Sequence, residues 1–175
     1  GFKRHSPFNK NFKISPWHRI GDFSKLFLKP CEDGSSIDIF KIDSNESFYN
    51  AIKNAKNPDR PFLFEEFIEG KEFTVTIING KCLPAIQIVT ENEFYDYDAK
   101  YISNNTKLIE ADLSKEDKDR INNLAMKAYK EIGCSGWGRV DILQDINEKF
   151  YVLEINTVPG MTSHSCVPRS AALAG

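Results

Sequence analysis

Residues 138–156 read GRVDILQDINEKFYVLEIN. Apolar and polar side chains alternate in the first part, Gly138 to Leu143, and again in the last part, Phe150 to Asn156. Such alternation is typical of a half-buried β-strand, because successive side chains point to opposite faces. The polar segment Gln144 to Lys149 lies between the two parts and has the composition of a turn. The stretch therefore predicts an antiparallel β-hairpin.

The alternation also separates the side chains of this hairpin by chemistry. Asp141 projects from the face opposite Val140, and Glu154 and Asn156 share one face of the second strand. Antiparallel pairing can bring these three oxygen-bearing side chains together. Two close carboxylates repel unless a cation lies between them, and ligands that are all oxygen suit Mg²⁺ better than zinc. Taken alone, the spacing favours the more ordinary alternative of a solvated hairpin face.

The remaining pattern predicts a mixed α+β fold with mainly antiparallel strands. A helix is expected from about Ser114 to Ile132, where apolar residues recur at three- and four-residue spacing and Gly133 supplies a stop. Ser44 is a candidate N-cap for a second helix ending near Asn57-Pro58. Candidate strands are Phe12 to Ile20, Leu26 to Lys29, Phe62 to Phe67, Phe73 to Ile77 and Cys82 to Val89, with a hairpin turn at Asn79-Gly80 and a loop at Asn104 to Ala111.

The composition is that of a globular protein, with 41% hydrophobic and 27% charged residues. The 23 basic and 25 acidic residues are interspersed, so nothing indicates a nucleic acid or an anionic membrane as a partner. The cysteines lack the spacing of a zinc or redox motif, which favours free thiols in a reducing cytosol. No apolar run approaches the length of a membrane span. A cytoplasmic protein with a small polar substrate is expected.

Three further segments carry groups that suit a nucleotide or an oxyanion. Residues 29–36 (KPCEDGSS) lead from a strand end into a loop whose N–H groups, with Lys29, could meet phosphates. Residues 65–72 (EEFIEGKE) place acids around a short apolar stretch, as an adenine slot and a ribose would require. Pro159-Gly160 forces a turn directly after the second hairpin strand, and its N–H groups could hold an oxyanion. The first two segments, taken alone, are better explained as an ordinary polar turn and an edge strand with its turn.

Three motifs in collinear order resemble the D-alanine–D-alanine ligase family of the ATP-grasp superfamily. They are residues 94–101 (FYDYDAKY), 133–141 (GCSGWGRVD) and 153–162 (LEINTVPGMT). The resemblance extends over about residues 12–175. It implies an ATP-grasp fold of two lobes of mainly antiparallel sheet with helices, without the N-terminal α/β domain of the family. Residues 1–70 would form part of the central lobe, and residues 71–175 the C-terminal catalytic lobe, truncated at its last helix.

The resemblance also implies roles for individual residues. ATP would be held by Lys29 at its phosphates, by Glu65, Glu66 and Ile68 at adenine and by Glu72 at ribose. Two Mg²⁺ ions, for which Mn²⁺ could substitute, would be bound by Asp141, Glu154 and Asn156. The catalytic set would be Ser35, Lys100, Tyr101, Arg139 and Gly160, and Ser165 would bind the carboxylate of the second substrate. Ser103 to Ala111 would form a loop that closes over the site.

The implied reaction joins two D-alanines for the synthesis of peptidoglycan precursors. ATP would phosphorylate one D-alanine to D-alanyl phosphate, which the amine of the second D-alanine would attack. Such a phosphoryl transfer requires alignment and charge neutralisation rather than an enzyme nucleophile. A complete enzyme is expected to be a cytoplasmic homodimer. Two alternatives stay open, namely an ATP-binding remnant without turnover and an ATP-grasp ligase for other substrates.

Three positions depart from the family pattern. Asp33 stands where the family usually has Glu, Asp38 where it usually has Gly, and Cys166 where an aliphatic residue is common. The chain starts at Gly1 and stops as a helix is expected to begin near Ala171, so both ends are expected to be incomplete.

Overall fold

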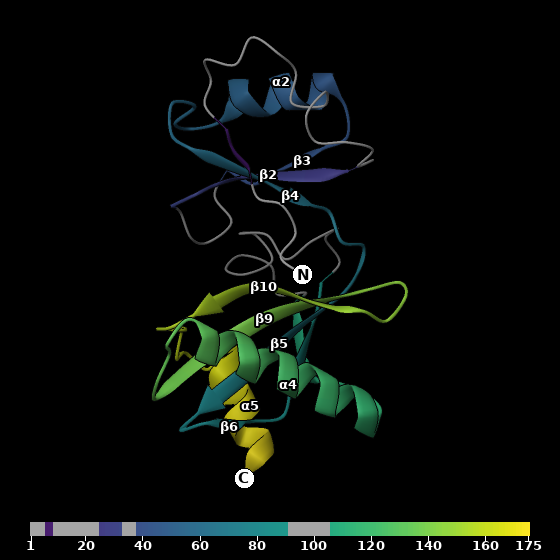
Figure 1. The fold of residues 1–175 in the computed structure, drawn as a ribbon, viewed down its shortest axis with the longest axis vertical. Helices are drawn as coiled ribbons and strands as arrows, with labels where there is room; N and C mark the ends of the chain where they lie inside the picture. The colour runs from purple at the N-terminus through teal and green to yellow at the C-terminus, as the bar shows by residue number, and fades with distance from the viewer. Residues whose placement is uncertain (1–5, 9–24, 33–37, 91–105) are drawn as a thin grey trace. The chain divides into compact units, whose positions relative to one another are not determined.

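The computed structural model describes residues 6–8, 25–32, 38–90 and 106–175. The described residues fall into two compact units, one ending at Phe67 and the other beginning at Ile68. Each unit contains an antiparallel sheet with helix packed on it (Figure 1). This arrangement confirms the predicted α+β fold class. The predicted division of the chain after residue 70 into two lobes of the ligase family stays a prediction.

The first unit is a small sheet covered by one helix. Its strands are β1 (Ser6–Phe8), β2 (Leu26–Pro30), β3 (Phe40–Ile42) and β4 (Phe62–Glu66), in the antiparallel order β1-β4-β2-β3. The helix is α2 (Asn45–Asn54), and Ser44 forms the predicted N-cap by exchanging hydrogen bonds with Ser47 in a capping box. Phe48 and Ala51 of α2 pack against the buried Leu28 and Phe64 of the sheet.

The second unit is built around a larger antiparallel sheet in the order β10-β9-β5-β7-β8. Its strands are β5 (Gly70–Ile78), β6 (Lys81–Cys82), β7 (Ile86–Val89), β8 (Lys107–Glu110), β9 (Trp137–Asp145) and β10 (Phe150–Asn156), with β6 paired to β5. Its helices are α4 (Lys115–Glu131) and α5 (Cys166–Ala174). The predicted hairpin of residues 138–156 is thus confirmed as β9 and β10.

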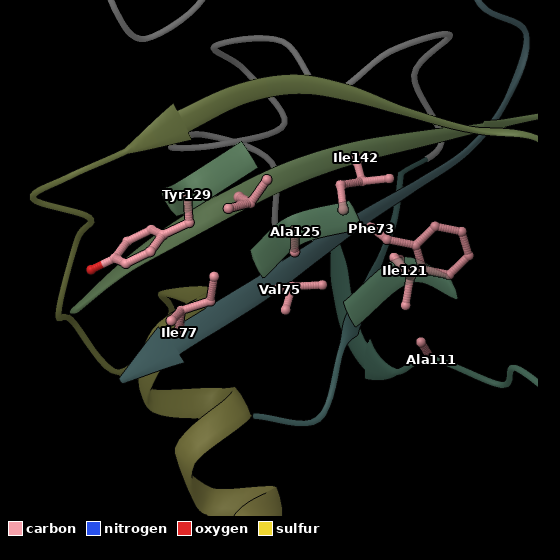
Figure 2. Packing of buried hydrophobic residues seen from close by; sticks show 9 residues of the cluster. Phe73, Val75, Ile77, Ala111, Ile121, Ala125, Tyr129 and Ile142 are labelled. Atoms are coloured by element: carbon pink, nitrogen blue, oxygen red, sulfur yellow. The ribbon is translucent and has the colours of Figure 1, made fainter. Parts of the chain in front are cut away.

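The core of the second unit lies between α4 and one face of the sheet. Figure 2 shows side chains of β5, β9 and α4 meeting in this layer. The fully buried members of the cluster are Phe73, Val75, Ile77, Ile121, Ala125, Val140 and Ile142. They follow the period of two along the strands and of three to four along the helix, as the sequence predicts. The opposite face of β5 and β9 is therefore the one that carries their polar side chains.

Helix α5 packs on the part of the same sheet that ends with β8, where it contacts β5, β7 and β8. Ser170 is fully buried, and its hydroxyl donates to the carbonyl oxygen of Pro84 over 2.6 Å. This helix begins at Cys166, earlier than the start near Ala171 expected from the sequence. In the described part of the chain, no helix is long and apolar enough to cross a membrane.

Two sequence predictions are wrong in detail. The strand expected from Cys82 to Val89 is split into β6 and β7, because Pro84 has no N–H to continue the ladder. The sequence predicts a loop at Asn104 to Ala111, and the resemblance implies a closing loop at Ser103 to Ala111. Both predictions of a loop are wrong over Lys107–Glu110, which form β8 paired with β7. The side chains of this edge strand are mostly exposed, so backbone hydrogen bonds hold it without a clear hydrophobic pattern. The strand predicted at Phe12 to Ile20 lies outside the described residues.

A substitution at Gly70, the first residue of β5, tests the close packing of β5 against β9. Gly70 has φ of 154°, and a Cβ there would lie 1.9 Å from the carbonyl oxygen of Gln144 on β9. We expect Gly70→Ala to lower the free energy of unfolding by about 2–4 kcal/mol, because both the backbone and its neighbour must shift. Urea unfolding followed by circular dichroism measures the change. The exposed neighbour provides the control, since Lys71→Ala should change stability by less than about 0.5 kcal/mol. Equal stability of the two variants would contradict the close approach of the strands.

Candidate functional site

The register of the β9–β10 hairpin places two carboxylates opposite each other. Val152 pairs with Ile142, and Glu154 then pairs with Asp141, so the register shifts between these pairs. The extra residue, Leu153, is a β-bulge. Without it, Leu153 would oppose Asp141, and Glu154 would lie on the core face. The bulge therefore brings Glu154 to the face of the sheet that carries Asp141.

A hydrogen-bonded group of four side chains occupies this face. The Arg139 guanidinium donates from Nε to Asp141 Oδ1 over 2.8 Å and from Nη2 to Asp141 Oδ2 over 2.7 Å. Asn156 Nδ2 donates to Asp141 Oδ2 over 3.0 Å and to Glu154 Oε1 over 3.2 Å. Asp141 is buried, whereas Glu154 is exposed. The structure thus brings together four residues that the sequence assigned to the site.

The charges in this group are strongly coupled. Burial alone would lower the pKa of the Arg139 guanidinium, but the charge of Asp141 and the hydrogen bonds to it raise that pKa above its ordinary value. Arg139 therefore stays charged and holds both oxygens of Asp141 in a bidentate pair. Because Arg139 balances one of the two carboxylates, the three charged side chains together keep one net negative charge. This residual charge faces the exposed side of the hairpin at Glu154.

The donor set fits a hard divalent cation. Asp141, Glu154 and the amide oxygen of Asn156 are all oxygen ligands on one sheet face, as Mg²⁺ or Mn²⁺ requires. No cluster of three or more His, Cys, Asp or Glu suited to a metal occurs within the part of the chain that the structure describes. Asn156 now directs its N–H group toward both carboxylates, and rotation of the amide would present its oxygen instead.

Hydrogen bonds join Thr162 to Ser165 at the start of α5. The Ser165 hydroxyl accepts from the N–H of Thr162 over 3.1 Å and lies 2.9 Å from the Thr162 hydroxyl. A Cβ on Gly160 would lie 3.0 Å from the same Ser165 oxygen, so a larger residue would press on it. Ser165 is the N-cap of α5, but its side chain does not cap the helix. Its hydroxyl is engaged with Thr162 instead.

In the first unit, two of the residues assigned to ATP, Lys29 and Glu65, lie on the sheet face opposite α2. The Lys29 ammonium forms an ion pair of 2.5 Å with the Glu65 carboxylate. The rings of Phe27 and Phe67 lie beside them with their centroids 5.3 Å apart. Glu66 alternates to the other face of β4, so only its main chain can take part on the face of Glu65.

Asp38 is held by hydrogen bonds from two residues of the first unit. It adopts a positive φ of 58°, a conformation that favours glycine, the residue expected there from the family resemblance. Its carboxylate accepts from Arg60 over 2.5 Å and from the N–H of Lys56 over 3.0 Å. These bonds offset the backbone cost of a non-glycine residue. Ser35, Lys100 and Tyr101 lie outside the described residues.

Two further residues assigned to ATP from the sequence, Glu72 and Ile68, lie in the second unit. Glu72 pairs with Leu143 on the face of β5 that Asp141 shares across the ladder. Ile68 is half-buried at the start of the second unit. A pocket of about 270 Å³ between the β6–β7 connection, β8 and α4 contains none of the residues expected to bind ATP, metal or substrate. The hydrogen-bonded group on the hairpin face lies outside this pocket.

The two antiparallel sheets, their helices and the oxygen donors of the hairpin define an ATP-grasp fold. A family model described as "D-ala D-ala ligase C-terminus" matches residues 23–175. The chain therefore belongs to the D-alanine–D-alanine ligase family.

Individual relatives agree with this assignment. The D-alanine–D-alanine ligase of Mannheimia succiniciproducens is 46% identical over 151 residues, which cover 86% of this chain and 49% of that protein. A D-alanine–D-alanine ligase from Bacillus anthracis, solved in complex with ATP, is similar with a TM-score of 0.78 and 28% identity over 98% of this chain and 54% of that one. The VanG D-Ala:D-Ser ligase of Enterococcus faecalis gives a TM-score of 0.80 and 28% identity over 98% and 52%. The chain spans about half the length of the curated relatives it matches.

The turn of the hairpin gives a pH-dependent test of its geometry. Asp145 accepts from the N–H groups of Asn147 and Lys149 and from the Tyr151 hydroxyl, each over 2.9 Å. The backbone hydrogen bond from Lys149 is the main cause that lowers the pKa of Asp145 below its ordinary value of 3.8. The charged carboxylate thus stabilises the folded state above about pH 5, and this contribution is lost as the pH falls through the lowered pKa.

We therefore expect Asp145→Asn to be less stable than the parent at pH 7, with a difference that narrows toward pH 3. Urea unfolding over this pH range measures it. Tyr151→Phe removes one of the three hydrogen bonds and should show a smaller effect of the same sign. A stability difference that does not depend on pH would contradict the role of the carboxylate charge.

Proposed function

We propose that this chain is the ATP-binding and catalytic part of a ligase that joins two D-alanines through D-alanyl phosphate. The observation that carries the proposal is the bulged hairpin, which sets Glu154 opposite Asp141 with Asn156 beside them. The names of the relatives support the substrate class. In a complete enzyme this reaction would serve peptidoglycan precursor synthesis in the cytoplasm, and the enzyme would be a homodimer.

ATP would be the nucleotide, and the residues assigned to it occur in both units of the chain. In the first unit, the apolar face around Phe27 and Phe67 suits adenine, with Glu65 and the main chain of Glu66 at its edge. Ile68 of the second unit would complete the adenine contacts. Lys29 is held by Glu65 and would exchange this partner for the ATP phosphates.

Ribose and metal recognition belong to the second unit. Glu72 would accept hydrogen bonds from the ribose hydroxyls. Asp141, Glu154 and Asn156 would hold two Mg²⁺ ions, or Mn²⁺ in their place, which neutralise phosphate charge during transfer. Arg139 keeps Asp141 oriented through its two hydrogen bonds.

The chemistry proceeds in two transfers. An oxygen of the first D-alanine carboxylate attacks the γ-phosphorus of ATP, and ADP leaves. The amine of the second D-alanine then attacks the acyl carbon, loses its proton and expels phosphate. Arg139 and the N–H of Gly160 would stabilise the tetrahedral oxyanion, and Ser165 would bind the carboxylate of the second substrate. Ser35, Lys100 and Tyr101 would position the first substrate and the transferred phosphate.

A second candidate is a ligase that takes another amino acid as its second substrate. The observation in its favour is the likeness to VanG, which is named a D-Ala:D-Ser ligase and covers the same part of the chain. The short hydrogen-bonded turn of Thr162 and Ser165 would meet the second substrate in either case. Competition between D-alanine and D-serine in the ligation assay distinguishes the two candidates.

The metal assignment predicts a selective loss of nucleotide binding. We expect Glu154→Gln to keep the metal-independent affinity for ATP but to lose most of the Mg²⁺-dependent gain, because the change removes an anionic ligand and conserves the volume. Isothermal titration with ATP, with and without Mg²⁺, measures both parts. Glu148→Gln changes an exposed acid in the turn of the same hairpin and serves as the matched control. Equal Mg²⁺ dependence in the Glu154 variant and the parent would refute the assignment.

The ligase reaction itself is tested by following both products. With ATP, Mg²⁺ and D-alanine, we expect the chain alone to release phosphate but to form little dipeptide. Orientation of the first substrate can contribute about 7–11 kcal/mol of barrier lowering, and in the resembled family an N-terminal domain provides much of that grip. Addition of the N-terminal half of the Mannheimia succiniciproducens relative should raise dipeptide formation. Absence of both products in both mixtures would contradict the proposed function.

A further inference from the structure

Two buried threonines of β5 lie beside the hairpin group and have no hydrogen-bond partner for their side chains. Thr74 is 1% exposed and Thr76 is 0% exposed. Among the described residues, neither Oγ1 atom has a donor or acceptor within hydrogen-bonding reach. A buried hydroxyl without a partner destabilises the folded state. Valine has nearly the same shape as threonine and has no hydroxyl to leave unpaired. Val75, which lies between the two threonines on the core face of β5, avoids the cost in this way.

The ladder shows which polar group each hydroxyl faces. Thr74 pairs with Asp141 of β9, and Thr76 pairs with Arg139. Directly opposed residues in antiparallel strands project from the same face, with Cβ atoms about 4.5–5.5 Å apart. On its other side Thr74 pairs with Ile86, which offers no polar side chain. The Asp141 carboxylate is therefore the polar group directly across the ladder from the Thr74 hydroxyl.

Asn156 occupies one of the acceptor positions of Asp141 in this arrangement. Oδ2 accepts from both Arg139 and Asn156, whereas Oδ1 accepts from Arg139 alone and keeps one acceptor position open. Asn156 can bind a cation only through its amide oxygen, and the required rotation removes its N–H from Asp141. Asp141 then has two open acceptor positions, one for the cation and one for a further hydrogen-bond donor.

We propose that Thr74 is a positioning residue for the metal site. Its hydroxyl donates to the Asp141 carboxylate when Asn156 turns its oxygen toward the divalent cation. The exchange keeps two donors on Asp141, from Arg139 and Thr74, and so fixes its rotamer for metal binding. Partners of this kind orient metal ligands, and their loss typically weakens metal binding about 10–100-fold. This inference rests on the proposed metal site of Asp141, Glu154 and Asn156.

Isosteric substitutions separate this role from packing. Mn²⁺ serves as the probe, and electron paramagnetic resonance of the free ion gives the affinity of the chain. We expect Thr74→Val to bind Mn²⁺ about 10–100-fold more weakly than the parent. Without metal, the same variant should melt about 2–4 °C higher, because it no longer buries an unpaired hydroxyl. Thr74→Ser keeps the hydroxyl and should bind Mn²⁺ within about threefold of the parent.

Thr76→Val is the matched control on the same strand and face. It also removes a buried unpaired hydroxyl, but opposite Arg139, so it should raise the melting temperature without weakening Mn²⁺ binding. The inference would be overturned if Thr74→Val bound Mn²⁺ as tightly as the parent, or if Thr76→Val lost as much Mn²⁺ affinity as Thr74→Val. A lower melting temperature of metal-free Thr74→Val would also overturn it. If Thr74→Val does not fold, a loss of affinity in Thr74→Ala relative to Thr74→Ser supports the inference, and equal affinities overturn it.

The proposed metal site can fail separately from this role. If the parent chain shows no saturable Mn²⁺ binding, the metal site is refuted and the role of Thr74 with it. The same holds if Mn²⁺ binding survives the Glu154→Gln substitution. Binding that is lost in Glu154→Gln but retained in Thr74→Val would leave the metal site standing and refute the role of Thr74 alone.

Discussion

The register of β9 is the constraint on which the second unit depends. This strand pairs with β5 on one side and with β10 on the other, so its alternating side chains determine both faces of the sheet. Val140 and Ile142 enter the core below α4 and are fully buried. Arg139 and Asp141 consequently lie on the opposite face. A slip of one residue would bury a carboxylate in the core and leave valine in the site, so the hydrophobic core also fixes the position of the chemistry.

The bulge on β10 and the charge of Arg139 make this arrangement suitable for a cation. The bulge at Leu153 moves Glu154 onto the face of Asp141, where two carboxylates would repel each other. Arg139 offsets one of these charges and fixes Asp141 with two hydrogen bonds, while Asn156 bridges both acids. These hydrogen bonds fix the arrangement of the group, and its remaining negative charge favours a divalent ion. Rigid support from the sheet reduces the ordering needed when ligands bind.

The sequence predicts strongly periodic elements well and weakly patterned ones poorly. Helix α4 and the β9–β10 hairpin have clear periods, and both are confirmed. Strand β8 was missed because an exposed edge strand is held by its backbone. Alternation places Glu154 and Asn156 on one face of their strand, but the bulge that brings Glu154 opposite Asp141 leaves no compositional signal. Thr74 was missed because a β-branched residue in an apolar strand has the pattern of a core residue, and only its buried, unpaired hydroxyl distinguishes it.

Paramagnetic broadening by Mn²⁺ in the NMR spectrum of the ¹⁵N-labelled chain tests the central claim most directly. The effect falls steeply with distance from the ion, so the amides that broaden first mark the binding site. In the presence of ATP, the account predicts that the amides of Asp141, Glu154 and Asn156 broaden first at low Mn²⁺ concentration. The amide of Lys127, exposed on α4, should keep its intensity under the same conditions. Earlier broadening along α4 than on the hairpin would contradict the assignment of the metal to this face of the sheet.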